Sequence, residues 1–242
     1  MLARCGRSAS RAMTALLEAE RRALRVLRIA GSVVLVLFLV STAVAPRAPV
    51  RENTPGFQNP VIGLELASRP EHVFGILGRP GSAERGMVAV RMRLATWIDC
   101  LFLLAYPGIY VGIALLLAAH GGMSHGLVRL VAALAVMMAV GDALENATLF
   151  RLMREVDPVR MAPALVQLRI FTLVKWYALY AASALVAVAI RREPGWWRWS
   201  ALFFAAAALL GLLAVFHLPA IEWSVAALGI AWIMTYARAW AS

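Results

Sequence analysis

The chain has 242 residues, of which 62% are hydrophobic and 15% charged, with a mean hydropathy of +0.75. That composition, with several apolar runs of about twenty residues, excludes a soluble domain and predicts an integral membrane protein built as one domain. The 24 Lys and Arg outnumber the 13 Asp and Glu, but most of the basic residues are arginines that flank apolar spans. We therefore expect anchoring to membrane lipids and no nucleic-acid partner.

The N-terminal segment, residues 1–28, carries seven arginines, and its four leucines between positions 16 and 27 recur at roughly helical spacing. This pattern predicts a basic amphipathic helix that lies at the membrane surface and leads into a first span at residues 29–45. Ala43-Val44-Ala45 resembles a signal-peptidase site. Pro46 and the long basic segment predict that the span is retained.

Residues 46–93 form the longest hydrophilic stretch and are predicted to be an extramembrane loop. Four prolines up to position 60 predict an irregular beginning. Apolar residues with polar ones between them follow in residues 61–77 and predict one or two short interfacial helices. A Gly-Arg-Pro-Gly turn at residues 78–81 then precedes the next span. This loop is also where we expect a protein partner, if there is one.

Six transmembrane helices are predicted in total, because five further spans follow the loop, at residues 94–119, 130–150, 170–190, 200–216 and 220–237. Residues 151–169, between the third and fourth spans, are polar and contain Pro158 and Pro163, which predicts irregular chain there. An even number of spans places both termini on one side. The arginine cluster of residues 1–28 favours the cytoplasmic side for the N-terminus.

The third span contains three polar residues, Asp142, Glu145 and Asn146, which share one helix face. Alanines at every fourth position from Ala135 to Ala147 predict a neighbouring face for close helix packing. An ionisable group at the centre of a membrane costs about 2.5–3.5 kcal/mol on insertion scales, so such carboxylates need partners, protons or water.

Polar residues of other spans reach the same depth. Asp99, Glu145 and Lys175 each lie six residues inside an arginine at the loop-side end of their span. At 1.5 Å per residue, each is roughly 9 Å from the same membrane face, with Asp142 about one turn deeper. We therefore expect these side chains to converge beneath the loop that carries Glu65.

The predicted site combines an acid or ion-pair centre of Asp142, Glu145 and Lys175 with surrounding binding residues. The binding residues are Asp99, Asn146, Tyr106, Tyr110, Trp176, Tyr177 and Glu65. Three acids within the spans face one base, so an acid holds a proton, an interfacial arginine reaches in, or a cation or ligand completes the site. A simpler interpretation is an ion pair that fixes helix register.

We expect no metal ion and no cofactor. The four histidines and two cysteines show no metal-ligand spacing. His120 and His125 lie in a glycine-rich turn, where we expect solvated side chains.

Five short motifs between residues 65 and 180 together resemble a group of small bacterial multi-span membrane proteins of uncharacterised function. They are Glu65-Leu66-Ala67, Ile76-Leu77-Gly78, Asp99 with Leu101-Phe102-Leu103 and Tyr106, Asp142-x-x-Glu145-Asn146, and Lys175-Trp176. The resemblance implies a multi-pass protein of the bacterial cytoplasmic (inner) membrane and supports the importance of these positions. It implies no activity.

Three functions stay open from the sequence. The first is binding or acid-assisted processing of a lipid-like or isoprenoid-like molecule, with Asp142 or Glu145 as acid, Lys175 as its electrostatic partner and the aromatic residues as a wall. The second is an accessory or scaffold subunit with a purely structural ion pair. The third is a proton-coupled transporter, although the chain shows no internal repeat and no polar residues that continue to the opposite face.

Overall fold

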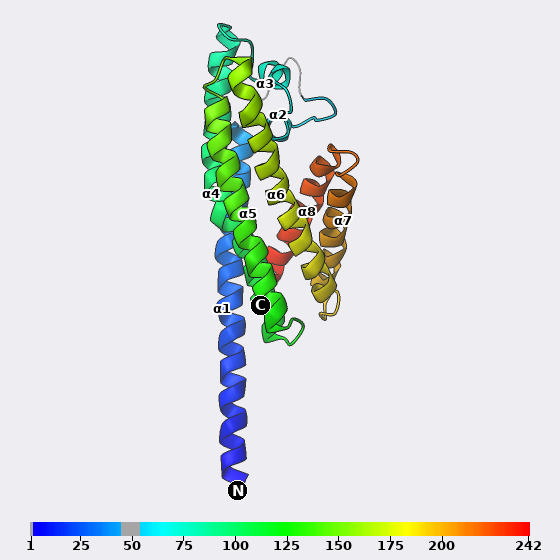
Figure 1. Cartoon of the computed structure of the whole chain (residues 1–242). Coiled ribbons are helices and arrows are strands. Elements are labelled where there is room, and N and C mark those ends of the chain that lie inside the picture. Colours follow the sequence, from blue (N-terminus) through cyan, green and yellow to red (C-terminus); the bar gives the residue numbers. More distant parts are fainter. Residues whose placement is uncertain (1, 45–53) are drawn as a thin grey trace.

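The computed structural model describes residues 2–44 and 54–242, with side chains described from residue 13 onward. In the described chain every regular element is a helix (Figure 1). The helices are α1 (Leu2–Val44), α2 (Pro60–Glu65), α3 (Pro70–Leu77), α4 (Ala83–Ala119), α5 (His125–Leu152), α6 (Pro158–Ile190), the 3₁₀ helix η1 (Trp196–Trp199), α7 (Ser200–Leu213) and α8 (Ala220–Trp240). Six helical segments are long and apolar enough to cross a membrane. The predicted polytopic helix bundle is confirmed, whereas the loop start at residues 46–53 lies outside the described residues.

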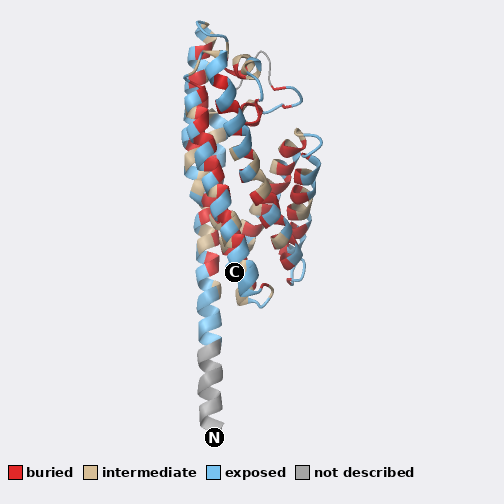
Figure 2. Cartoon of the chain, viewed as in Figure 1, coloured by how far each residue is buried: buried red, intermediate tan, exposed pale blue. Residues whose placement is uncertain are grey.

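Helix α1 runs along α4 and then extends past the other helices (Figure 1). Its 43 residues join the predicted basic segment and the predicted first span into one unbroken helix. A Cβ atom at Gly112 would lie 2.8 Å from the side chain of Leu27, so glycine allows the two backbones to approach. Beyond the end of α4, residues 13–19 of α1 are exposed (Figure 2).

Helices α4 to α6 are longer than a bilayer is thick. The 37 residues of α4 span about 55 Å at 1.5 Å per residue, against about 30 Å of hydrocarbon. At their loop-side ends these helices pack with α2 and α3 around an apolar core that is separate from the main core of the bundle. We call this part of the structure the cap; its core includes Leu64, Val73, Leu77, Met92, Leu152 and Leu165. The short helices predicted within residues 61–77 are therefore confirmed.

The connection between α5 and α6 is shorter than the sequence predicted. Irregular chain through residues 151–169 was the wrong expectation, because α6 begins at Pro158. Proline needs no N–H partner in a first helical turn. The side chain of Asp157 caps the helix by accepting the N–H of Val159, and Pro163 is accommodated inside α6.

Arg85 connects the turn that follows α3 to the turn that precedes α6. Its guanidinium donates to the carbonyl oxygen of Gly78 at 2.9 Å and to that of Glu155 at 2.8 Å. The same group lies over the ring of Phe74. These bonds satisfy carbonyl groups at the ends of elements and close the cap.

Helices α7 and α8 form a hairpin that packs against α6 and α1. At the tip of the hairpin, the carboxylate of Glu222 accepts the backbone N–H groups of Gln58 at 3.0 Å and Asn59 at 2.7 Å. Asn59 in turn caps α2. The hairpin thereby holds the segment that leads into α2, the helix that carries Glu65.

Helices α5 and α6 pack backbone to backbone at Gly141. A Cβ atom there would lie 3.0 Å from the backbone nitrogen of Lys175 and 3.2 Å from the carbonyl oxygen of Phe171. The alanine face predicted for close packing contributes less, since Ala143 and Ala147 are exposed. The close approach depends on a glycine that lies outside the alanine pattern.

We expect Gly141→Val to destabilise the protein by about 1–3 kcal/mol, because the new methyl groups must displace the backbone of α6. Gly229→Val is the matched control, since nothing lies within 4 Å of a Cβ atom at that position. Thermal unfolding in detergent micelles measures both variants. Equal unfolding temperatures would contradict this account of the packing between α5 and α6.

Candidate functional site

Lys175 lies at the centre of the buried charged cluster. Its ammonium nitrogen is 2.5 Å from Glu145 Oε1, 3.3 Å from Asp142 Oδ1 and 3.5 Å from Glu65 Oε2. All four side chains are buried. The predicted centre of Asp142, Glu145 and Lys175 is therefore assembled in the structure, and Glu65 joins it from outside the spans.

Three of the predicted binding residues extend the cluster on the side of α4. The amide nitrogen of Asn146 donates to Asp99 Oδ2 at 2.9 Å, and the hydroxyl of Tyr106 donates to Asp142 Oδ2 at 3.0 Å. Asp99 is partly exposed, whereas Asn146 and Tyr106 are buried. The cluster thus joins α2, α4, α5 and α6.

Helix geometry explains why these side chains meet. On α5, the neighbours Glu145 and Asn146 lie one turn after Asp142, and all three side chains face inward. Lys175 lies on α6 directly across the glycine contact at Gly141. Glu65 is the last residue of α2, and its carbonyl oxygen accepts the hydroxyl of Thr172 at 3.2 Å.

The cluster contains more acid than base. Its four carboxyl groups, Glu65, Asp99, Asp142 and Glu145, face one ammonium group, so three negative charges would be uncompensated if all ionised. Two buried acceptors in the described part of the chain, Glu145 Oε2 and Asn146 Oδ1, have no hydrogen-bond donor. Uncompensated charge at low dielectric is costly. The site is therefore suited to binding protons or another cation.

Glu65 is the acid of this cluster that lies outside the membrane-spanning segments. Burial raises the pKa of its carboxyl group to about 7, an effect that Lys175 opposes and that Asp99 and Asp142 reinforce. Glu65 consequently changes its charge near neutral pH.

The aromatic residues predicted to form one wall have separate surroundings in the structure. Trp176 lies beside the cluster, with its ring 5.2 Å from the Lys175 ammonium. Tyr106 stacks on Trp232. Tyr110 is farther into the bundle, where it shares a hydrogen bond with Ser183, and the ring of Tyr177 contacts that of Tyr180.

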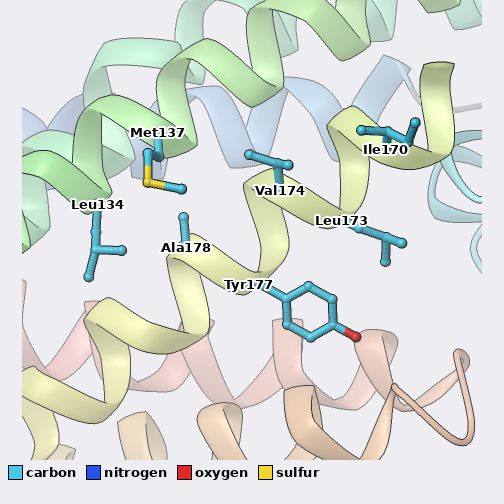
Figure 3. Close-up of a pocket in the computed structure, with 7 residues that line it drawn as sticks. All are labelled: Leu134, Met137, Ile170, Leu173, Val174, Tyr177 and Ala178. Carbon is cyan, nitrogen blue, oxygen red and sulfur yellow. The ribbon is translucent and has the colours of Figure 1, made fainter.

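Tyr177 belongs instead to an apolar groove of about 460 Å³ between α5 and α6 (Figure 3). The groove is lined by Leu134, Met137, Ile170, Leu173, Val174, Tyr177 and Ala178. It lies along the α5–α6 pair that also carries Asp142, Glu145 and Lys175, and it is open at the surface. Its dimensions and lining suit a hydrocarbon chain.

His120 belongs to a second polar contact that the sequence did not predict. Its Nδ1 lies 2.7 Å from Glu193 and its Nε2 lies 3.4 Å from Glu20. His120 is exposed, in keeping with the expected solvated side chain, but its ring also joins three distant parts of the chain. The partners are 73 and 100 residues away in the chain, so no local pattern signals the contact.

Comparisons with known protein families, with characterised proteins and with solved structures found no match to this chain. The resemblance to uncharacterised bacterial membrane proteins stays a prediction, and the site is interpreted from its own chemistry.

We expect Glu65→Gln to flatten the pH dependence of stability. The carboxyl pKa of Glu65 is raised from 4.5 in an ordinary environment to about 7 in the fold. The folded state therefore holds this proton more tightly, and stability falls as pH rises from about 4.5 through 7. Unfolding temperatures measured from pH 5 to 8 should decline more steeply for the natural protein than for the variant. Parallel curves would contradict the raised pKa.

Proposed function

We propose that this integral membrane protein binds a lipid-like molecule and that its charged cluster acts as an acid toward that molecule. The observation that carries the proposal is the ratio of four carboxyl groups, three of them buried, to one ammonium group. Asp99 is the partly exposed member of this set.

A buried carboxyl group surrounded by other carboxyl groups is able to hold a proton at neutral pH, as general acids in enzymes do. Lys175 compensates one carboxylate, and the hydroxyl of Tyr106 and the amide of Asn146 each add a hydrogen bond. One or more of the remaining carboxyl groups would then carry a proton. Asp142 and Glu145 are the acids closest to Lys175 within the spans.

A lipid-like ligand is supported by the surroundings of the cluster. The acids of α4 and α5 lie within candidate membrane spans, so molecules dissolved in the membrane are those that reach them most directly. The apolar groove between α5 and α6 would accommodate a hydrocarbon chain (Figure 3). Trp176 adds an aromatic face beside the ammonium group.

A structural role is the second candidate, favoured by the contacts of Lys175 with three acids on two other elements. Glu65 belongs to α2, whereas Asp142 and Glu145 belong to α5. Such contacts would hold α2, α5 and α6 in register, as an accessory or scaffold subunit requires.

The test is native mass spectrometry of the purified protein beside Glu145→Gln, with extraction and identification of retained lipids. We expect the natural protein to retain a defined lipid and the variant to retain at least tenfold less while still folding. The substitution preserves shape and removes the carboxyl group that lies closest to Lys175.

Glu18→Gln is the control, because Glu18 is an exposed acid on α1 whose partner is the neighbouring Arg22. It should retain as much lipid as the natural protein. Equal lipid retention in Glu145→Gln would rule out the proposed site. If no defined lipid is retained and Glu145→Gln is much less stable, the structural role is supported instead.

A further inference from the structure

We propose that Asp99, Asp142 and Glu145 form a binding site for one hard divalent cation, of the class of Mg²⁺, Ca²⁺ or Mn²⁺, with the side-chain oxygen of Asn146 as a further ligand. This proposal goes beyond the proposed lipid function and does not require it. It also departs from the expectation of no metal, which rested on the spacing of histidines and cysteines.

The first argument is geometric. One carboxylate oxygen from each of Asp99, Asp142 and Glu145 lies within 4.8 Å of the other two. Oxygens that bind one Mg²⁺ or Ca²⁺ ion at about 2.1–2.5 Å lie at most about 5 Å apart. The three carboxylates come from two neighbouring helices, α4 and α5, whose packing sets their separation.

The second argument comes from oxygens that have no donor. Glu145 Oε2 and Asn146 Oδ1 accept no hydrogen bond from any described residue, although Glu145 is fully buried and Asn146 is 2% exposed. Both residues use their other polar atom within the cluster, Glu145 toward Lys175 and Asn146 toward Asp99. Buried acceptors in this state are rare in folded proteins, and a cation bound at this site would satisfy both of them.

The third argument concerns the balance of charge. Lys175 contacts Glu65, Asp142 and Glu145, whereas the hydrogen-bond donor to Asp99 is the neutral amide of Asn146. The side of the cluster toward α4 therefore has one acidic group, Asp99, without a basic partner among the described ion pairs. A divalent cation and Lys175 would together compensate three of the four carboxylates and leave one to hold a proton.

The kind of cation follows from the ligand atoms. All the proposed ligands are carboxylate or amide oxygens, which favour hard cations over zinc or copper. Asp99 is partly exposed, so it would be the first ligand that an arriving ion meets.

Manganese alone is the probe, because bound and free Mn²⁺ are distinguished by electron paramagnetic resonance. We expect the purified full-length protein to bind one Mn²⁺ per chain with saturation, and Asp99→Asn to bind at least tenfold more weakly. Asn146→Ala, which leaves the number of charges unchanged, should also weaken binding. Glu18→Gln is the control for binding at exposed acids and should match the natural protein.

Two results would overturn the proposal: no saturable binding by the natural protein, or equal binding by Asp99→Asn. Thermal unfolding of the natural protein is a further test that needs no variant. Mn²⁺ should raise its unfolding temperature, and EDTA should reverse the rise. An unchanged unfolding temperature would count against the site. Lipid retention measured in EDTA separates the two proposals, because a retained lipid with no manganese binding would leave only the lipid function standing.

Discussion

The ammonium group of Lys175 is the contact on which the arrangement of the bundle depends. It meets carboxylates from α5 and from α2, so one side chain links a membrane helix to its neighbour and to the extramembrane loop. Removing one member of such a buried group leaves the remaining charges without compensation. The resulting loss of stability is much larger than the net stability that the intact ion pair contributes. The same imbalance makes the cluster able to hold protons or a cation.

The rest of the structure places the partners of Lys175. Gly141 allows α5 and α6 to approach until the acids and the lysine are in contact. Glu222 holds the backbone at Gln58 and Asn59, and Thr172 holds the carbonyl of Glu65, so α2 is fixed from the hairpin and from α6. Arg85 closes the cap above them. Close packing at Gly141 and polar contacts at the loop-side ends of the helices therefore together position the partners of Lys175.

Much of this arrangement follows from local patterns in the sequence. Apolar runs predict the spans, and helical periodicity places Asp142, Glu145 and Asn146 on one face. Counting residues from the flanking arginines predicts that Asp99, Glu145 and Lys175 lie at the same depth, and they do meet in one cluster.

The remaining features depend on contacts between distant segments. Glu65 was predicted among the binding residues, but its partner was not: it reaches Lys175 because Glu222 and Thr172, more than 100 residues away, hold α2 in place. The start of α6 at Pro158 was missed because proline was taken to interrupt a helix when it begins one. Tyr110 has the spacing of a site residue, but its hydroxyl is committed to Ser183. For the site residues within the spans, sequence pattern predicts the depth in the membrane and the helix face. Tertiary contacts decide which side chain each of these residues binds.

The most direct test of the central claim is a double-mutant cycle between Lys175 and Glu145, with Lys175→Met, Glu145→Gln and the combined variant unfolded in the same detergent. Lys175→Met alone should destabilise the protein by about 3–5 kcal/mol, because it leaves the acids without their cation. The combined variant should be more stable than the sum of the two single effects predicts, by about 0.5–3 kcal/mol. Effects that simply add would contradict the claim that Lys175 is the charge on which this cluster depends.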